Sequence, residues 1–242
     1  TVWHPMGNCT RCIRGQIMEL LRETVRRILL EGRGMFTYQD LPPRACITCS
    51  ESDYRDGWWI TYTYFDENGN ATFDLDTEGD NKEGIVVEDA RGWPIYGTIK
   101  VGYVEKGRRG NCDGALKVSY VEASSGWGPL LYDCAIEWAT MKAGGLIPDR
   151  VAVSDEARDV WSYYMNNRPD VKMKQLDNEE DSFDNGPDDD CDQAVARQLP
   201  GLTDDFDAPL DFSGDWQASA LSKKYTKFPT TINALKERWV EK

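Results

Sequence analysis

The hydrophobic period of the sequence changes at a glycine turn, and this change constrains the fold more than any other feature. Residues 115–121 read as a strand, because apolar and β-branched side chains alternate with polar ones. Beyond Gly126 and Gly128 the apolar residues recur at three- and four-residue steps as far as Gly144-Gly145, a pair that is typical of a helix end. Pro129 suits the first turn of this helix, where its missing N–H costs nothing. The segment therefore predicts a strand, a tight turn and a helix in direct succession.

A turn of this kind presents backbone N–H groups at the positive end of a helix, and such groups bind phosphate. The two glycines also lack the Cβ atoms that would obstruct a ligand. The candidate ligand-binding residues are Val121, Ser125, Gly126, Trp127, Gly128 and Leu130. The alternative is an ordinary strand-to-helix turn that binds nothing.

Other periodic segments place this unit within an α+β protein. An amphipathic helix is expected at 15–30, and a hairpin is expected from the aromatic stretch 58–65 and residues 71–75. Further strands are expected at 84–88 and 94–105. After a short extended segment, Ser154 is placed to cap a helix that runs to about Asn166. These elements predict a mixed, mostly antiparallel sheet flanked by helices.

The net charge of −14 is concentrated in one segment. Residues 176–215 contain 14 acidic side chains and the single base Arg197, so the rest of the chain is almost neutral. We expect a poorly structured acidic C-terminal extension, with no direct nucleic-acid binding. No stretch approaches the roughly 20 apolar residues of a membrane-spanning helix, so we expect no membrane contact and a cytoplasmic location.

Four regions follow from these patterns. We expect an N-terminal helix with a cysteine-pair clasp (1–57), a core of sheet and helices (58–175), the acidic linker (176–215) and a C-terminal docking segment (216–242).

Two CxxC pairs predict a structural zinc site. Cys9 and Cys12 form the first pair, Cys46 and Cys49 the second, and four sulfurs can complete a tetrahedral zinc site. The alternative is that they are free thiols or transient disulfides. The chain has seven cysteines, an odd number that fits a reducing compartment better than a fully paired disulfide framework. Cys134 lies on the apolar helix and is expected in the core.

The run from Glu122 to Leu130 resembles motif A of the GNAT acyltransferase superfamily, in which a strand and a glycine turn precede a helix that receives the diphosphate of coenzyme A. The segment 154–164 is similar to the next motif of that family, and 126–133 resembles acetyltransferase-like proteins encoded by bacteriophages. The resemblance covers about residues 98–171, with a weaker echo at 220–225. Two positions depart from the family pattern, since Ala123 stands where Gln or Arg is usual and Trp161 aligns with a common Tyr.

The resemblance implies a GNAT-like fold and an acetyl-CoA-dependent N-acyltransferase, with an acceptor that is a protein or a small amine. An amine that attacks a thioester needs a base. Glu122 is the first candidate and Glu105 the second, while Tyr164 is the candidate acid that protonates the thiolate. Each has a plainer interpretation, as a solvated acid or a core aromatic.

The alternative function is an inactive GNAT-fold protein that serves as a phage structural component in the virion or contacts other phage or host proteins. A further alternative is that the acidic segment mimics DNA.

Overall fold

The structure is a computed structural model. The chain consists of two compact units, Thr1–Met35 and Phe36–Lys242. The described residues are 35–54, 56–65, 87–90, 92–93, 95–104, 112–149, 153–176 and 218–242. The predicted N-terminal helix, the hairpin turn at 66–75 and the acidic segment after Leu176 lie outside them.

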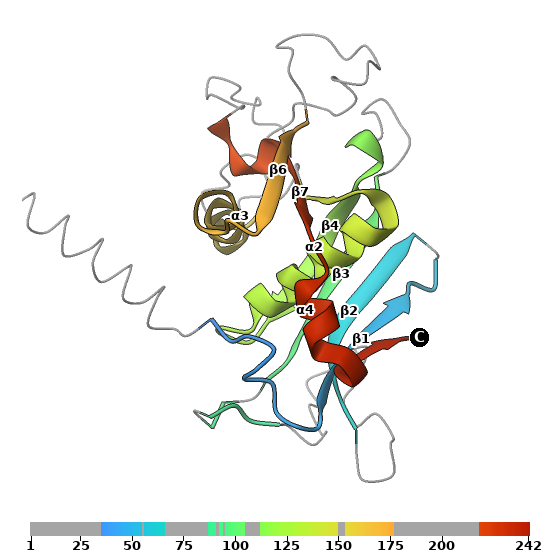
Figure 1. The fold of residues 1–242 in the computed structure, drawn as a ribbon, viewed down its shortest axis with the longest axis vertical. Coiled ribbons are helices and arrows are strands. Elements are labelled where there is room, and N and C mark those ends of the chain that lie inside the picture. Colours follow the sequence, from blue (N-terminus) through green and yellow to red (C-terminus); the bar gives the residue numbers. More distant parts are fainter. Residues whose placement is uncertain are drawn as a thin grey trace, which may run out of the picture. The chain divides into compact units, whose positions relative to one another are not determined.

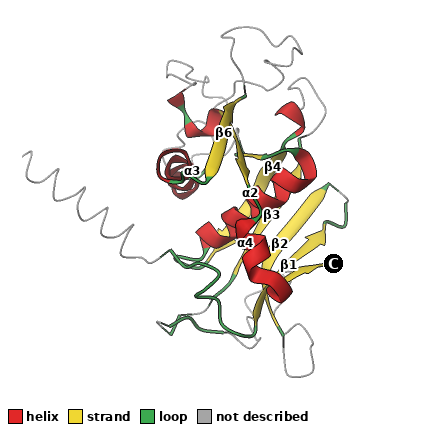
Figure 2. Ribbon diagram, in the orientation of Figure 1, coloured by secondary structure: helices red, strands yellow, loops and turns green. Residues whose placement is uncertain are grey.

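One mixed sheet organises the described part of the second unit (Figures 1 and 2). Its eight strands have the order β6-β7-β5-β4-β3-β2-β1-β8. The strands are β1 (Ala45–Glu51), β2 (Gly57–Tyr64), β3 (Gly97–Tyr103), β4 (Leu116–Ala123), β5 (Leu146–Ile147), β6 (Val171–Gln175), β7 (Lys223–Lys227) and β8 (Trp239–Glu241). Neighbours are antiparallel except β4 with β5 and β1 with β8. The expected α+β class is therefore confirmed.

Three α-helices are described, namely α2 (Gly128–Ala143), α3 (Asp155–Asn167) and α4 (Thr230–Leu235). The predicted glycine stop of α2 is confirmed, because Gly144 adopts the left-handed conformation with φ 75°. The predicted cap of α3 is also confirmed, since Ser154 accepts a hydrogen bond from the Ala157 N–H. Within the described residues, no helix combines the length and apolar character needed to cross a bilayer.

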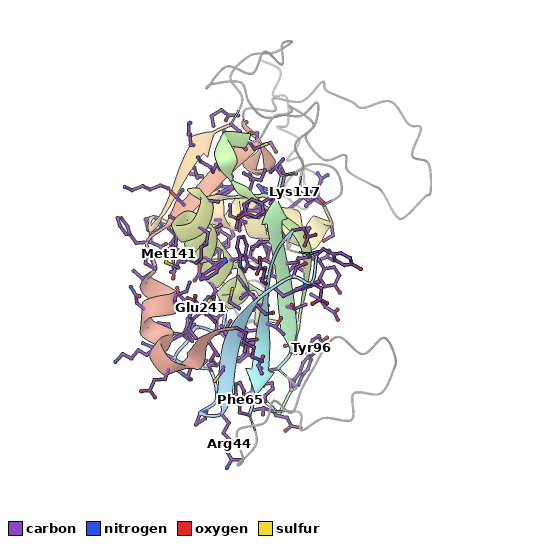
Figure 3. All side chains as sticks on the ribbon, turned by 90° about the vertical axis from the view of Figure 1, so that its right-hand side faces the viewer. Arg44, Phe65, Tyr96, Lys117, Met141 and Glu241 are labelled. Carbon is purple, nitrogen blue, oxygen red and sulfur yellow. The ribbon has the colours of Figure 1, made fainter. Side chains whose placement is uncertain are left out.

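The core lies between α2 and one face of the sheet. Alternate residues of the strands, including Ile60, Ile99 and Leu116, are fully buried there together with Leu131 and Cys134 of α2. Figure 3 shows α2, marked by Met141, and α4 on one side of the strands. The predicted core position of Cys134 is confirmed.

α3 packs on the same face through aromatic contacts. Trp161 contacts Tyr132 of α2, with ring centroids 5.3 Å apart, and Tyr225 of β7 at 4.8 Å. These contacts bury Trp161 almost completely. The residue that departs from the family pattern is therefore a core side chain.

The C-terminal residues belong to the core, which corrects two expectations. β7 lies between β5 and β6, and β8 extends the sheet beyond β1. The acidic segment consequently joins two neighbouring strands and is not a C-terminal extension. The core is also wider than the expected 58–175, because β1, β7 and β8 complete the same sheet.

A buried ion pair fixes this C-terminal segment to α2. Glu137, which is fully buried, pairs with Lys227 at the end of β7 and accepts the backbone N–H groups of Thr231 and Ile232, each at 2.8 Å. A buried carboxylate is costly unless it is paired and hydrogen-bonded. Glu137 meets both conditions and also caps α4.

Candidate anion-binding site at the turn between β4 and α2

β4 and β5 separate after a short parallel pairing. They share the pairs Leu116–Leu146 and Lys117–Ile147, and β4 continues for six further residues to Ala123. Along those residues β4 pairs with β3 on its other side, and the register shifts at Lys100. The carboxyl end of β4 therefore lies at an opening in the sheet, which is where open α/β sheets bind ligands.

The turn is built on hydrogen bonds that hold Gly126 in an unusual conformation. The Trp127 N–H donates to the Ser124 carbonyl at 3.0 Å, and the Phe36 N–H donates to the Gly126 carbonyl at 3.1 Å. Gly126 has φ 90°, a conformation that residues with a Cβ rarely adopt. This requirement explains the first glycine without reference to a ligand.

Gly128 has no such structural requirement. A Cβ placed there would lie 3.8 Å from its nearest neighbour, the Cβ of Ala123, which is an ordinary contact. Among the described residues, no side chain caps the N-terminus of α2, where Trp127 is the N-cap residue. Ser125, Gly126 and Gly128 are half-buried, so part of the turn is open to solvent.

The side chains around the turn form its inner wall. Trp127 is fully buried, stacks on Phe36 with ring centroids 4.4 Å apart, and its carbonyl accepts the Tyr62 hydroxyl at 2.7 Å. Leu130 is buried and Val121 half-buried, both in the core. Of the predicted binding residues, Val121, Trp127 and Leu130 can therefore contribute backbone groups and not side chains.

Two buried side-chain donors, one at the turn and one in the second turn of α2, have no hydrogen-bond partner among the described residues. They are Nε1 of Trp127 and the hydroxyl of Tyr132, which is 2% exposed. The ring of Tyr132 packs against Trp161 and Tyr164 of α3, at centroid distances of 5.3 and 6.2 Å. Unpaired buried polar groups are rare in native proteins and call for an explanation such as a bound ligand.

Glu122 is exposed at the end of β4, as a base for an incoming amine must be. It accepts the Tyr120 hydroxyl at 2.7 Å, and this bond is the main reason that the pKa of Tyr120 is raised. Sequence reasoning did not single out Tyr120, although its place two residues before Glu122 in a strand puts both side chains on one face. The second candidate base, Glu105, lies outside the described residues.

Tyr164 is fully buried, and both of its hydrogen bonds are internal. Its hydroxyl donates to the carboxylate of Asp133 at 2.9 Å and to the Pro129 carbonyl at 3.0 Å. Burial raises its pKa well above the ordinary value. The arrangement fits a residue that fastens α3 to the start of α2 and offers no proton to a ligand in this conformation.

The described cysteine pair lies within β1. Cys46 and Cys49 are three residues apart in a strand, so their side chains point to opposite faces of the sheet. This geometry does not favour a metal shared by both sulfurs. Cys9 and Cys12 lie outside the described residues, and the four-cysteine zinc site stays an untested prediction. The residues that are described contain no group of three metal-ligating side chains.

One further described cysteine, Cys112, is disulfide-bonded.

No protein-family model, curated protein or solved structure matches this chain.

Proposed function

We propose that the chain is a GNAT-like N-acyltransferase that holds the diphosphate of coenzyme A at the turn between β4 and α2. One observation carries the proposal: the uncapped N-terminus of α2 lies directly after the end of β4, where β4 and β5 have separated. The resemblance to GNAT acyltransferases implies this arrangement, in which a strand, a glycine turn and a helix lie at a splayed edge of a mixed sheet.

The residues at the turn suit a diphosphate. The backbone N–H groups of Gly126, Gly128 and Leu130 lie at the positive end of α2, and Gly128 leaves room for close approach. Coenzyme A would supply the activated acyl thioester. Glu122 would accept the proton that the acceptor amine loses.

Titration calorimetry with coenzyme A and the Gly128→Ala variant tests this function. The added methyl group fits the fold, because its nearest neighbour is 3.8 Å away, but it would occupy the space of a bound diphosphate. We expect at least a tenfold loss of coenzyme A affinity in Gly128→Ala and no loss in the control Met141→Ala, an exposed residue near the other end of α2. Absence of binding at millimolar coenzyme A, or equal affinity in Gly128→Ala, would exclude the proposal.

The burial of Tyr164 favours a second candidate, binding without acyl transfer. A GNAT-like scaffold without an available acid would suit a structural component of a phage particle or a protein that contacts host proteins. Coenzyme A binding without any single-turnover acyl transfer to amines would support this candidate. Stoichiometric presence of the chain in purified virions would identify the structural role.

A further inference from the structure

The face of the sheet opposite α2 carries two groupings of the same kind, each an aromatic ring beside a carboxylate. Trp59 of β2 and the nearby Asp56 form the first, while Tyr120 and Glu122 of β4 form the second. The rings of Trp59 and Tyr120 meet edge to face with centroids 6.0 Å apart. These four residues, together with Lys100 of β3, are called the aromatic strip below.

The first grouping already holds an alkylammonium group, the side chain of Lys100. Its Nζ lies 5.4 Å from the ring centroid of Trp59 and 3.0 Å from the Asp56 carboxylate. An aromatic face and a carboxylate attract an ammonium group by separate mechanisms, the ring quadrupole and a charge-assisted hydrogen bond. The protein thus contains an internal example of what this combination binds.

The second grouping repeats the combination without a lysine or arginine from the described part of the chain. Tyr120 is 46% exposed, and its hydroxyl donates to Oε2 of Glu122 at 2.7 Å. This bond holds the carboxylate at the hydroxyl end of the Tyr120 ring and leaves Oε1 of Glu122 without a donor among the described residues. A ring face and a carboxylate oxygen are therefore both accessible from solvent.

We propose that Tyr120 and Glu122 bind the alkylammonium group of a small organic amine. The site selects a cation, because Glu122 and Asp56 would repel phosphates and carboxylates. Binding at an open site of this kind is weak, with a dissociation constant in the millimolar range. This binding does not require coenzyme A, although an amine held by Glu122 would lie on the same strand as the turn, four residues before Gly126.

The inference is tested by titrating the full chain with n-butylammonium chloride and following the backbone amide resonances of residues 119–123. The neutral n-butanol is the control ligand, and sodium chloride at equal ionic strength is the control salt. We expect saturable shifts with n-butylammonium only. Equal shifts with n-butanol or sodium chloride would overturn the inference.

Substitutions at the strip separate its two components. Glu122→Gln and Tyr120→Leu should each weaken n-butylammonium binding at least threefold, and Tyr120→Phe, which keeps the ring, should weaken it less than Tyr120→Leu. Both side chains are exposed, so the thermal unfolding midpoints should stay close to that of the unmodified chain. Unchanged binding in Glu122→Gln would refute the site.

The titration is made without coenzyme A, so its outcome is independent of the proposed enzymatic function. Ammonium binding in a chain that does not bind coenzyme A would support the ammonium site and exclude the proposed acyltransferase function. Coenzyme A binding without ammonium binding would exclude the ammonium site and leave the proposed acyltransferase function unaffected.

Discussion

Replacing Glu137 by Leu should release the C-terminal segment from α2. The substitution removes the nearest carboxylate from the buried ammonium group of Lys227, whose side chain is 2% exposed and which keeps Asp170 at 3.8 Å and Asp133 at 4.0 Å. It also removes the acceptor of two backbone N–H groups of α4. Breaking a buried ion pair by removing one partner costs about 3–5 kcal/mol. Since a domain is stable by only about 5–15 kcal/mol, we expect a loss of at least about 3 kcal/mol in the free energy of unfolding.

The measurement is urea unfolding followed by tryptophan fluorescence. Lys227→Met should cost less than Glu137→Leu, because Glu137 then keeps the two N–H donors and the Thr230 hydroxyl at 3.2 Å. The Lys227→Met variant also keeps the prediction testable if Glu137→Leu does not fold. The matched control is Asp56→Asn, because the Asp56 side chain is 53% exposed and the loss of its ion pair with Lys100 should cost less than about 1 kcal/mol.

The result that would refute this reasoning is a cost for Glu137→Leu that equals the cost of the surface control. A larger cost for Lys227→Met than for Glu137→Leu would also contradict it, since only the carboxylate accepts the backbone N–H groups of α4.

Three further predictions concern the turn and the buried polar groups. Tyr164→Phe should lower the free energy of unfolding, measured in urea, by about 1–2 kcal/mol, because the two internal hydrogen bonds of its hydroxyl are lost. Coenzyme A affinity and any acyl transfer should not change. Loss of acyl transfer without loss of coenzyme A affinity would instead identify Tyr164 as the acid that protonates the thiolate. Gly126→Ala should lower the thermal midpoint more than Gly128→Ala, because only Gly126 has a positive φ; the reverse order would be inconsistent with this backbone. In the native protein Cys46 should react with thiol reagents before Cys49, since burial raises the pKa of Cys49 to about 12; faster reaction of Cys49 would contradict the burial.

The sequence predicted the segments whose periodicity is long and uninterrupted. The turn from β4 into α2, the glycine stop of α2 and the Ser154 cap all follow from local chemistry, which acts within a few residues. β7 was missed because its sequence, KKYTK, contains three lysines and a single aromatic. Lys227 is buried there beside Glu137, and that pairing depends on tertiary packing.

The sequence predicted only part of the candidate site, because only part of it depends on local chemistry. The placement of Gly126 and Gly128 at the start of a helix could be inferred locally, as could the exposure of Glu122 at a strand end. The burial of Tyr164 could not, because it depends on the packing of α3 against α2. The interpretation of Cys46 and Cys49 as a zinc pair rested on the CxxC spacing, which does not reveal that both residues lie in β1.

The most direct test of the central claim is a comparison of coenzyme A with pantetheine, which lacks the diphosphate, by amide resonance shifts in the labelled full chain. We predict that coenzyme A shifts the amides of Gly126, Gly128 and Leu130 in a saturable manner and that pantetheine at the same concentration leaves these three almost unmoved. Equal shifts from both ligands, or coenzyme A shifts that avoid all three residues, would contradict a diphosphate site at this turn.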